Sequence, residues 1–429
     1  MLAIPGNAIK ECQLYDHSST IMSKHHSAQA QAKCVRTAEA RCQLKELLEG
    51  LKQEPDLVCM VLGSGALCWT GVCKWLLTML CDVRPPLDKM IRVKRGVTLT
   101  ESTEGFSRLC KYFRITGICL NDLGLHPDEA KLLCEQIRAC ETLTGIRLDM
   151  HTFPPPIADI FIRGLCAHSL KRLTLCCDLT RKDLALRVGA WLGTLTQLRE
   201  LNFRIVPQEE SRMPPLKEAL RKIGACHNME ALTLSSMQIK DGDLEELLRA
   251  WKHMPLSRLN LADNCLSEKS IKDLLEKHSQ FSQLNLSENP LGPRCPEHLK
   301  PTFPSLSFLS LKKTNIGPQG VSVLAEDADR LRNLKHLDIS DNGINTEGGP
   351  AIVRLLTQCK ALKHFDVSSN SLGSALNEPM HSAIAALKNL CYIDLRNNGF
   401  SSEQVDAFYE VVFALDRVLA GEIEFWISV

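Results

Sequence analysis

The sequence predicts an α/β solenoid of repeated strand–helix units, and three observations support this fold class. One template, L-x-x-L-x-L-x-x-N-x-L, recurs eleven times in register, with unit starts 25 to 31 residues apart. Alternating apolar residues within each unit predict a short strand with one buried face. Apolar residues three and four apart after the strand predict an outer helix. The units start at Ile115, Leu143, Leu170, Leu198, Met229, Leu256, Phe281, Leu306, Leu334, Leu362 and Leu390.

An asparagine follows the predicted strand in the clearer units. Its side-chain amide can satisfy backbone groups at the turn from the interior of the solenoid. The unit that starts at Leu306 carries Thr314 at this place. The asparagines at this position are Asn264, Asn289, Asn342, Asn370 and Asn398.

The repeat resembles a known class. Units of about 28 residues with a full outer helix are similar to the ribonuclease-inhibitor class of leucine-rich repeats. The stretch TQCKALKHFDVSSNSLG, Thr357 to Gly373, resembles the C-terminal repeats of NOD-like receptors. The resemblance covers about residues 115–400. It implies a leucine-rich-repeat horseshoe with a parallel concave sheet and outer helices, and a role as a protein-binding scaffold or receptor-like sensor.

The two ends differ from the repeats. Residues 1–114 are expected to form a helical N-terminal region or cap, partly disordered at the start, before the repeats of 115–400. Residues 401–429 are expected to form a C-terminal cap, because a solenoid otherwise exposes its core at its last unit. The spacing of Val405, Phe408 and Val412 predicts an amphipathic helix there, followed by a short strand. Phe425 and Trp426 are assigned to this cap, with an exposed binding tail as the alternative.

A largely apolar stretch at 57–81 has the length of a membrane span. Lys74 and three glycines within it favour a buried helix instead, and a span remains the alternative. If the stretch crossed a membrane, the basic residues that follow it would keep the repeats in the cytosol.

The motifs tested give no support for catalysis. Gly63, Gly65, Gly71 and Lys74 suggest a phosphate loop, but two residues separate Gly71 from Lys74, where G-x-x-x-x-G-K-[ST] requires none. No G-x-S-x-G, H-E-x-x-H or EF-hand loop occurs. We therefore expect no enzyme activity, no nucleotide-binding module and no cofactor.

The nineteen cysteines are scattered and odd in number, which favours a reduced, cytoplasmic setting. Cys140, Cys226 and Cys359 each precede a unit start by three residues, where a small apolar side chain suits tight packing. Metal ligation is the alternative. The absence of any C-x-x-C pair argues against it, and we expect no metal site at the vicinal pair Cys176 and Cys177.

The composition limits the classes of partner that the chain is expected to bind. The chain is 44% hydrophobic and 24% charged, with a net charge of +1. It lacks the basic excess that binding to a phosphate backbone requires, so no nucleic-acid partner is expected.

Equivalent positions in stacked parallel strands become neighbours, so columns of side chains can be predicted. One column ends in three carboxylates, flanked by a column of rings and a column with basic and hydroxyl groups. We hypothesise that this patch of the concave face contacts a basic or mixed segment of a protein partner. The alternative is a solvated face on which His and Arg compensate the carboxylates. The predicted contact residues are Phe308, His336, Asp338, His364, Asp366, Tyr392, Asp394 and Arg396; a more scattered second group is Arg147, Arg172, Arg204 and Arg258.

Two further functions use similar repeats. The first is activation of a GTPase, as in Ran GTPase-activating protein, whose family carries a long acidic tail; this chain instead ends in EIEFWISV. The second is inhibition of a ribonuclease, for which a strongly acidic horseshoe would suit a basic enzyme. The near-neutral charge argues against this second alternative.

Overall fold

The structure is a computed structural model that describes residues 90–93, 117–120, 125–165, 170–177, 182–205, 213–413 and 423–428. The chain divides into two units, Met1–Ile91 with Val97–Ile115, and Arg92–Gly96 with Thr116–Val429. Of the N-terminal region 1–114, predicted to be helical, the structure describes only residues 90–93, which form a strand; the apolar stretch 57–81 lies outside the described residues. A short strand, β1 (Met90–Val93), lies at the boundary between the units.

One parallel sheet forms the inner layer of the second unit. Each strand from β2 to β12 pairs in parallel with the next strand along the chain, ending at β13. The strands are β2 (Gly117–Leu120), β3 (Gly145–Asp149), β4 (Arg172–Cys177), β5 (Glu200–Ile205), β6 (Ala231–Thr233), β7 (Arg258–Asn260), β8 (Gln283–Asn285), β9 (Phe308–Ser310), β10 (His336–Asp338), β11 (His364–Asp366), β12 (Tyr392–Asp394) and β13 (Glu424–Trp426). Strands β2 to β12 lie within the eleven units that the sequence predicts.

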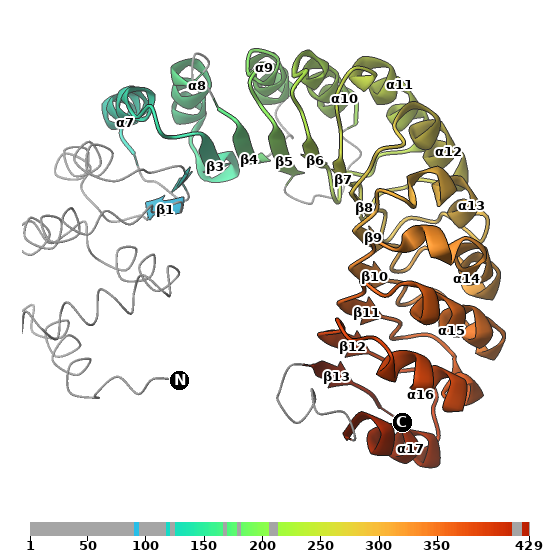
Figure 1. Ribbon diagram of the computed structural model, residues 1–429. Coiled ribbons are helices and arrows are strands. Elements are labelled where there is room, and N and C mark those ends of the chain that lie inside the picture. Colours follow the sequence, from blue (N-terminus) through green and yellow to red (C-terminus); the bar gives the residue numbers. More distant parts are fainter. Residues whose placement is uncertain are drawn as a thin grey trace, which may run out of the picture. The chain divides into compact units, whose positions relative to one another are not determined.

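A helix follows most strands and returns the chain to the next one. Within the second unit the strands lie on the inner side of an arc and the helices on its outer side (Figure 1). The helices are α7 (Pro127–Ala139), α8 (Pro155–Gly164), α9 (Lys182–Leu192), α10 (Met213–Lys222), α11 (Asp241–Trp251), α12 (Glu268–Lys277), α13 (Cys295–Leu299), α14 (Gly317–Glu326), α15 (Gly349–Gln358), α16 (Glu378–Ala385) and α17 (Ser402–Phe413).

The core lies between the two layers. In β7 and its continuation, Leu259 and Leu261 are 3% and 0% exposed, because period-two spacing sends both toward the helices. From the other side, α11 buries Leu244, Leu247, Leu248 and Trp251, which share one helix face. The Trp251 indole donates to the carbonyl of Leu220 in the preceding repeat at 3.0 Å. Burial of these apolar faces, unit after unit, stabilises the stack.

The recurring asparagines join successive repeats from inside, as predicted. Asn370 is 8% exposed, and its Oδ1 accepts from the backbone N–H groups of Asn342 and Ile344 at 3.0 Å each. Its Nδ2 donates to the carbonyls of Ile339 and Val367 at 3.1 and 2.9 Å. One side chain thereby satisfies buried backbone groups of two repeats. Thr314 makes fewer such bonds: its hydroxyl donates to Leu311 O at 2.6 Å.

The residue before each of these buried side chains adopts a left-handed backbone conformation. The φ values are 51° to 56° at Asp263, Glu288, Lys313, Asp341, Ser369 and Asn397. Such a conformation costs about 1 kcal/mol or more for a residue other than glycine. The asparagine bonds that hold the turn offset this cost.

The C-terminal segment adds a helix and a strand to the array. Helix α17 buries Val405, Phe408 and Val412, the face that the sequence predicted. Strand β13 pairs with β12 and places Trp426 beside Asp394.

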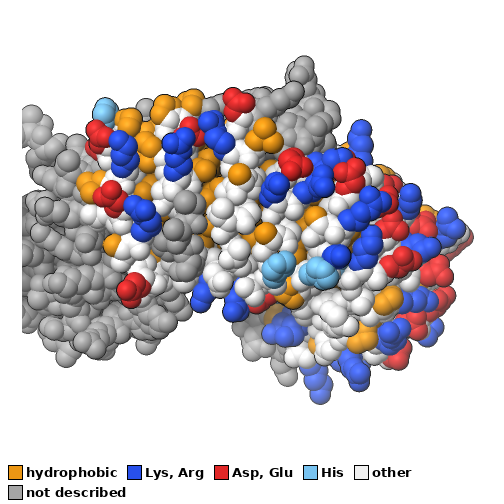
Figure 2. All heavy atoms as spheres, turned by 90° about the horizontal axis from the view of Figure 1, so that it is seen from above, with side chains coloured by type: hydrophobic (Ala, Val, Ile, Leu, Met, Phe, Trp, Pro, Cys, Tyr) orange, Lys and Arg blue, Asp and Glu red, His pale blue; other side chains and the backbone are white. Residues whose placement is uncertain are grey.

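The outer face carries charges of both signs. Figure 2 shows lysine and arginine side chains intermixed with aspartate and glutamate over its right-hand part. Charged side chains also pair between neighbouring units, as Lys217 Nζ does with Glu246 Oε2 at 3.1 Å and Lys300 Nζ with Glu326 Oε2 at 2.9 Å. Because such pairs are solvated, each stabilises the stack by about 0.2 to 1 kcal/mol at most.

Candidate functional site

Four rings form a row along the concave surface of β9 to β12. The sheet register pairs Phe308 with His336, His336 with His364, and His364 with Tyr392. The corresponding ring centroids lie 4.3, 5.5 and 5.9 Å apart, and the first pair is stacked with an interplanar angle of 9°. We call these four residues the ring row. His364 is exposed and the other three are half-buried, so the outer edges of the stacked rings are open to a partner.

A row of carboxylates runs beside the ring row. The register places Asp338 beside Asp366 and Asp366 beside Asp394, as the column prediction required. Asp338 and Asp366 each accept two hydrogen bonds from the serine two residues later in the chain. Asp338 Oδ1 accepts from Ser340 N and Oγ at 3.0 and 2.7 Å, and Asp366 Oδ1 accepts from Ser368 N and Oγ at 2.9 and 2.7 Å.

The second oxygen of each carboxylate distinguishes the three residues. Asp338 Oδ2 accepts from Ser310 Oγ at 3.1 Å. Asp366 Oδ2 has no hydrogen-bond partner within the described part of the chain. Asp366 therefore offers an oxygen to an incoming donor from the middle of the row.

Asp394 is compensated within the chain. It is 2% exposed, and it accepts from the Arg396 backbone N–H at 3.0 Å and from the Arg396 guanidinium. The Tyr392 hydroxyl donates to Asp394 Oδ2 at 3.3 Å. The Arg396 guanidinium carbon also lies 4.8 Å from the centroid of the Trp426 ring, a cation–π distance. The arginine compensation that the sequence left open as an alternative thus exists at this one carboxylate.

The electrostatics of the two rows reflect this difference. Burial raises the pKa of Asp366 above its ordinary value, and the charges of Asp338 and Asp394 add to the rise, although bonds from Ser368 oppose it. Arg396 holds the pKa of Asp394 below its usual value against the effect of burial. Burial, helped by His364, lowers the pKa of His336. A partner cation would relieve the repulsion that Asp366 experiences.

A shallow groove continues the concave surface toward the N-terminal side. Its volume is about 380 Å³, and its lining runs from Arg172 in β4 to Phe308 in β9. Arg258 forms an ion pair with Glu200 across this surface, two strands away. Ala231 stands between them in the register, and its small side chain leaves room for the contact. Because Phe308 belongs to both the groove and the ring row, the two form one continuous surface.

Sequence reasoning missed the pair formed by Arg258 and Glu200. The column Arg172, Glu200, Ala231, Arg258 contained the signal, since a small residue between opposite charges permits such a contact. The four arginines of the second predicted group do not form one cluster. Arg172 and Arg258 share a register position, whereas Arg147 and Arg204 each lie at a different one.

The cysteines with a predicted packing role are buried. Cys140, Cys226 and Cys359 are 4%, 0% and 1% exposed. The Cys226 thiol lies 3.3 Å from the carbonyl of Leu195 in the preceding repeat. Burial raises the pKa of Cys226 to about 11 and that of Cys359 to about 12, so both stay protonated thiols at neutral pH.

No helix among the described residues is long and apolar enough to cross a membrane.

Comparison with known proteins supports the repeat class. The Leucine Rich repeat family model matches residues 330–353, which include all of β10 and the start of α15. A comparison with curated proteins found no match. Together with the parallel sheet of β2 to β13 and its outer helices, the matched repeat defines the described chain as an α/β leucine-rich-repeat solenoid.

Proposed function

We propose that this chain is a non-catalytic protein-interaction scaffold that binds a basic, extended segment of a protein partner along the concave face. Leucine-rich repeats are typical of protein-binding scaffolds, since a solenoid presents a long concave surface. One observation supports this choice of partner most directly: the unpaired Asp366 Oδ2 lies beside a row of partly exposed rings.

The chemistry of the two rows favours an arginine or lysine side chain. An arginine can lay its guanidinium against the exposed ring edges of the row and donate hydrogen bonds to the neighbouring carboxylate at the same time. Asp366 and Asp338 are the carboxylates that we expect to contact the partner. We expect Asp394 to hold Arg396 in place instead, because it is buried and ion-paired.

Selection of short random peptides on the full chain tests the proposal. We expect the selected peptides to be rich in Arg and Lys, and their binding to weaken with salt. Asp366→Asn should lower their affinity about tenfold, since it removes a central, half-buried charge. Asp406→Asn, which changes an exposed carboxylate on α17, is the matched control and should bind as wild type does. Selection of acidic peptides, or equal affinities for the two variants, would contradict the proposal.

We further propose a receptor-like role similar to that of the repeat regions of NOD-like receptors, in the cytoplasm. The resemblance of residues 357–373 supports the role, and the location fits the described cysteines, among which no disulfide forms. Assays of GTP hydrolysis with a panel of small GTPases, and of ribonuclease inhibition, address the two alternatives. Stimulation or inhibition by the full chain at stoichiometric amounts would replace the scaffold proposal with that activity.

A further inference from the structure

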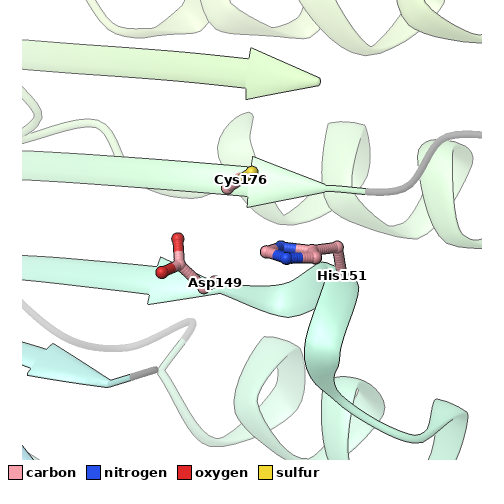
Figure 3. Close-up of side chains that lie close together, drawn as sticks. All are labelled: Asp149, His151 and Cys176. Atoms are coloured by element: carbon pink, nitrogen blue, oxygen red, sulfur yellow. The ribbon is translucent and has the colours of Figure 1, made fainter. Parts of the chain in front are cut away.

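Three side chains that commonly bind metals come together at the carboxyl ends of β3 and β4. Asp149 is the last residue of β3, His151 lies in the 3-10 turn η2 (Met150–Thr152) that follows, and Cys176 lies in β4. A ligand atom from each lies within 4.8 Å of a ligand atom from both others. Figure 3 shows the carboxylate, the imidazole and the sulfur around one space between the two strand ends.

The backbone fixes this arrangement. The ladder pairs Asp149 directly with Cys176, so their Cα atoms are held by the sheet. Met150 is 1% exposed and anchors the turn in the core, which leaves His151 exposed on the other side. Asp149 and Cys176 are half-buried. The sheet therefore holds the backbone of two of the three ligands at neighbouring positions, and the exposed His151 side chain has the most freedom to adjust.

We propose that Asp149, His151 and Cys176 bind a zinc ion. A thiolate, an imidazole and a carboxylate are the three ligand types that zinc takes in proteins. Three protein ligands leave the fourth tetrahedral position open to water or to a group of a partner. The sequence led us to expect no metal site here, because Cys176 has only Cys177 as a potential ligand next to it in the chain.

The charges around the site set its pH dependence. Burial raises the pKa of the Cys176 thiol most, and Asp149 raises it further, whereas Arg204 and Arg147 lower it. Zinc binding must displace the thiol proton, so one proton leaves for each ion bound, and affinity should increase with pH. Arg147 Nε lies 4.0 Å from Asp149 Oδ1, and Arg204 stands opposite Cys176 in the register. Both arginines weaken attraction for a cation but favour the thiolate that coordinates it.

Titration of the full chain with Co²⁺, followed by displacement with Zn²⁺, tests this site. Co²⁺ bound to a thiolate gives a sulfur-to-metal charge-transfer band that oxygen and nitrogen ligands do not give. We expect this band in wild type and its loss in Cys176→Ala. His151→Ala should weaken Zn²⁺ binding at least about tenfold. Because His151 is exposed, that variant should keep the wild-type circular dichroism spectrum.

Cys265→Ala is the matched control, because Cys265 is an exposed thiol after β7, several repeats away. It should bind Zn²⁺ as wild type does, and Cys176→Ala should bind one equivalent fewer. The proposal is overturned if wild type shows no charge-transfer band. It is also overturned if Cys176→Ala and His151→Ala match Cys265→Ala in affinity and stoichiometry.

Discussion

Asn342→Ala should destabilise the solenoid by about 3 kcal/mol, because two buried N–H groups lose their acceptor and each costs roughly 1 to 3 kcal/mol when unpaired. In the wild type, Asn342 is 4% exposed, and its Oδ1 accepts from Thr314 N at 3.0 Å and Ile316 N at 3.3 Å. Its Nδ2 donates to Leu311 O at 2.7 Å and Ser340 O at 3.0 Å. Alanine can replace none of these bonds.

Two measurements check this value. Chemical denaturation followed by circular dichroism gives the loss in the free energy of unfolding. Hydrogen exchange at the Thr314 and Ile316 amides gives the loss of local stability at this turn. The local value is needed because repeat arrays can unfold in parts. Asn333→Ala is the control, since exposed Asn333 makes one bond, from its Nδ2 to Pro304 O at 2.8 Å. The control should lose less than about 1 kcal/mol. Equal losses in the two variants would refute the role assigned to the buried asparagines.

Three other predictions follow from burial, charge and packing. Burial and the neighbouring His364 lower the pKa of His336 in the folded chain below its ordinary 6.5. As the pH falls below 6.5, His336 is therefore protonated in the unfolded chain before it is protonated in the folded chain, and the free energy of unfolding decreases. His336→Phe keeps the ring contact and should flatten the fall in Tm across this range; an unchanged slope contradicts the assignment. Gly224→Ala should destabilise by about 1 to 3 kcal/mol, because a Cβ would lie 2.5 Å from Ala250 O, whereas Gly242→Ala meets nothing within 4 Å and should not lower Tm. Exposed Cys265 and Cys391 should react with iodoacetamide before buried Cys226 and Cys359, as peptide mass spectrometry can show; prior labelling of Cys226 would disprove its packing role.

The sequence predicted the columns because strand register follows from the repeat itself. Once Leu337, Phe365 and Ile393 occupy equivalent buried positions, the neighbours Asp338, Asp366 and Asp394 must align as well. The buried asparagines followed from the same template. Their positions depend on local spacing, which a single sequence contains.

Features that depend on side-chain direction or on turns were not predictable in this way. Asp394 differs from Asp366 because the Arg396 guanidinium donates hydrogen bonds to it. The same guanidinium also contacts the ring of Trp426, a residue from outside the repeats. His151 reaches Cys176 only because the 3-10 turn after β3 redirects the chain. The left-handed residues before the buried asparagines and Thr314 are Asp, Glu, Lys, Ser and Asn, so no glycine marks these turns in the sequence.

NMR titration of the histidine side chains with a selected basic peptide tests the concave-face proposal most directly, with signals assigned from His→Phe variants. The imidazole signals of His336 and His364 should shift on binding, while that of exposed His253, in the turn after α11, should stay in place. Shifts at His253 with none at His336 and His364 would contradict the proposal that this face binds the partner.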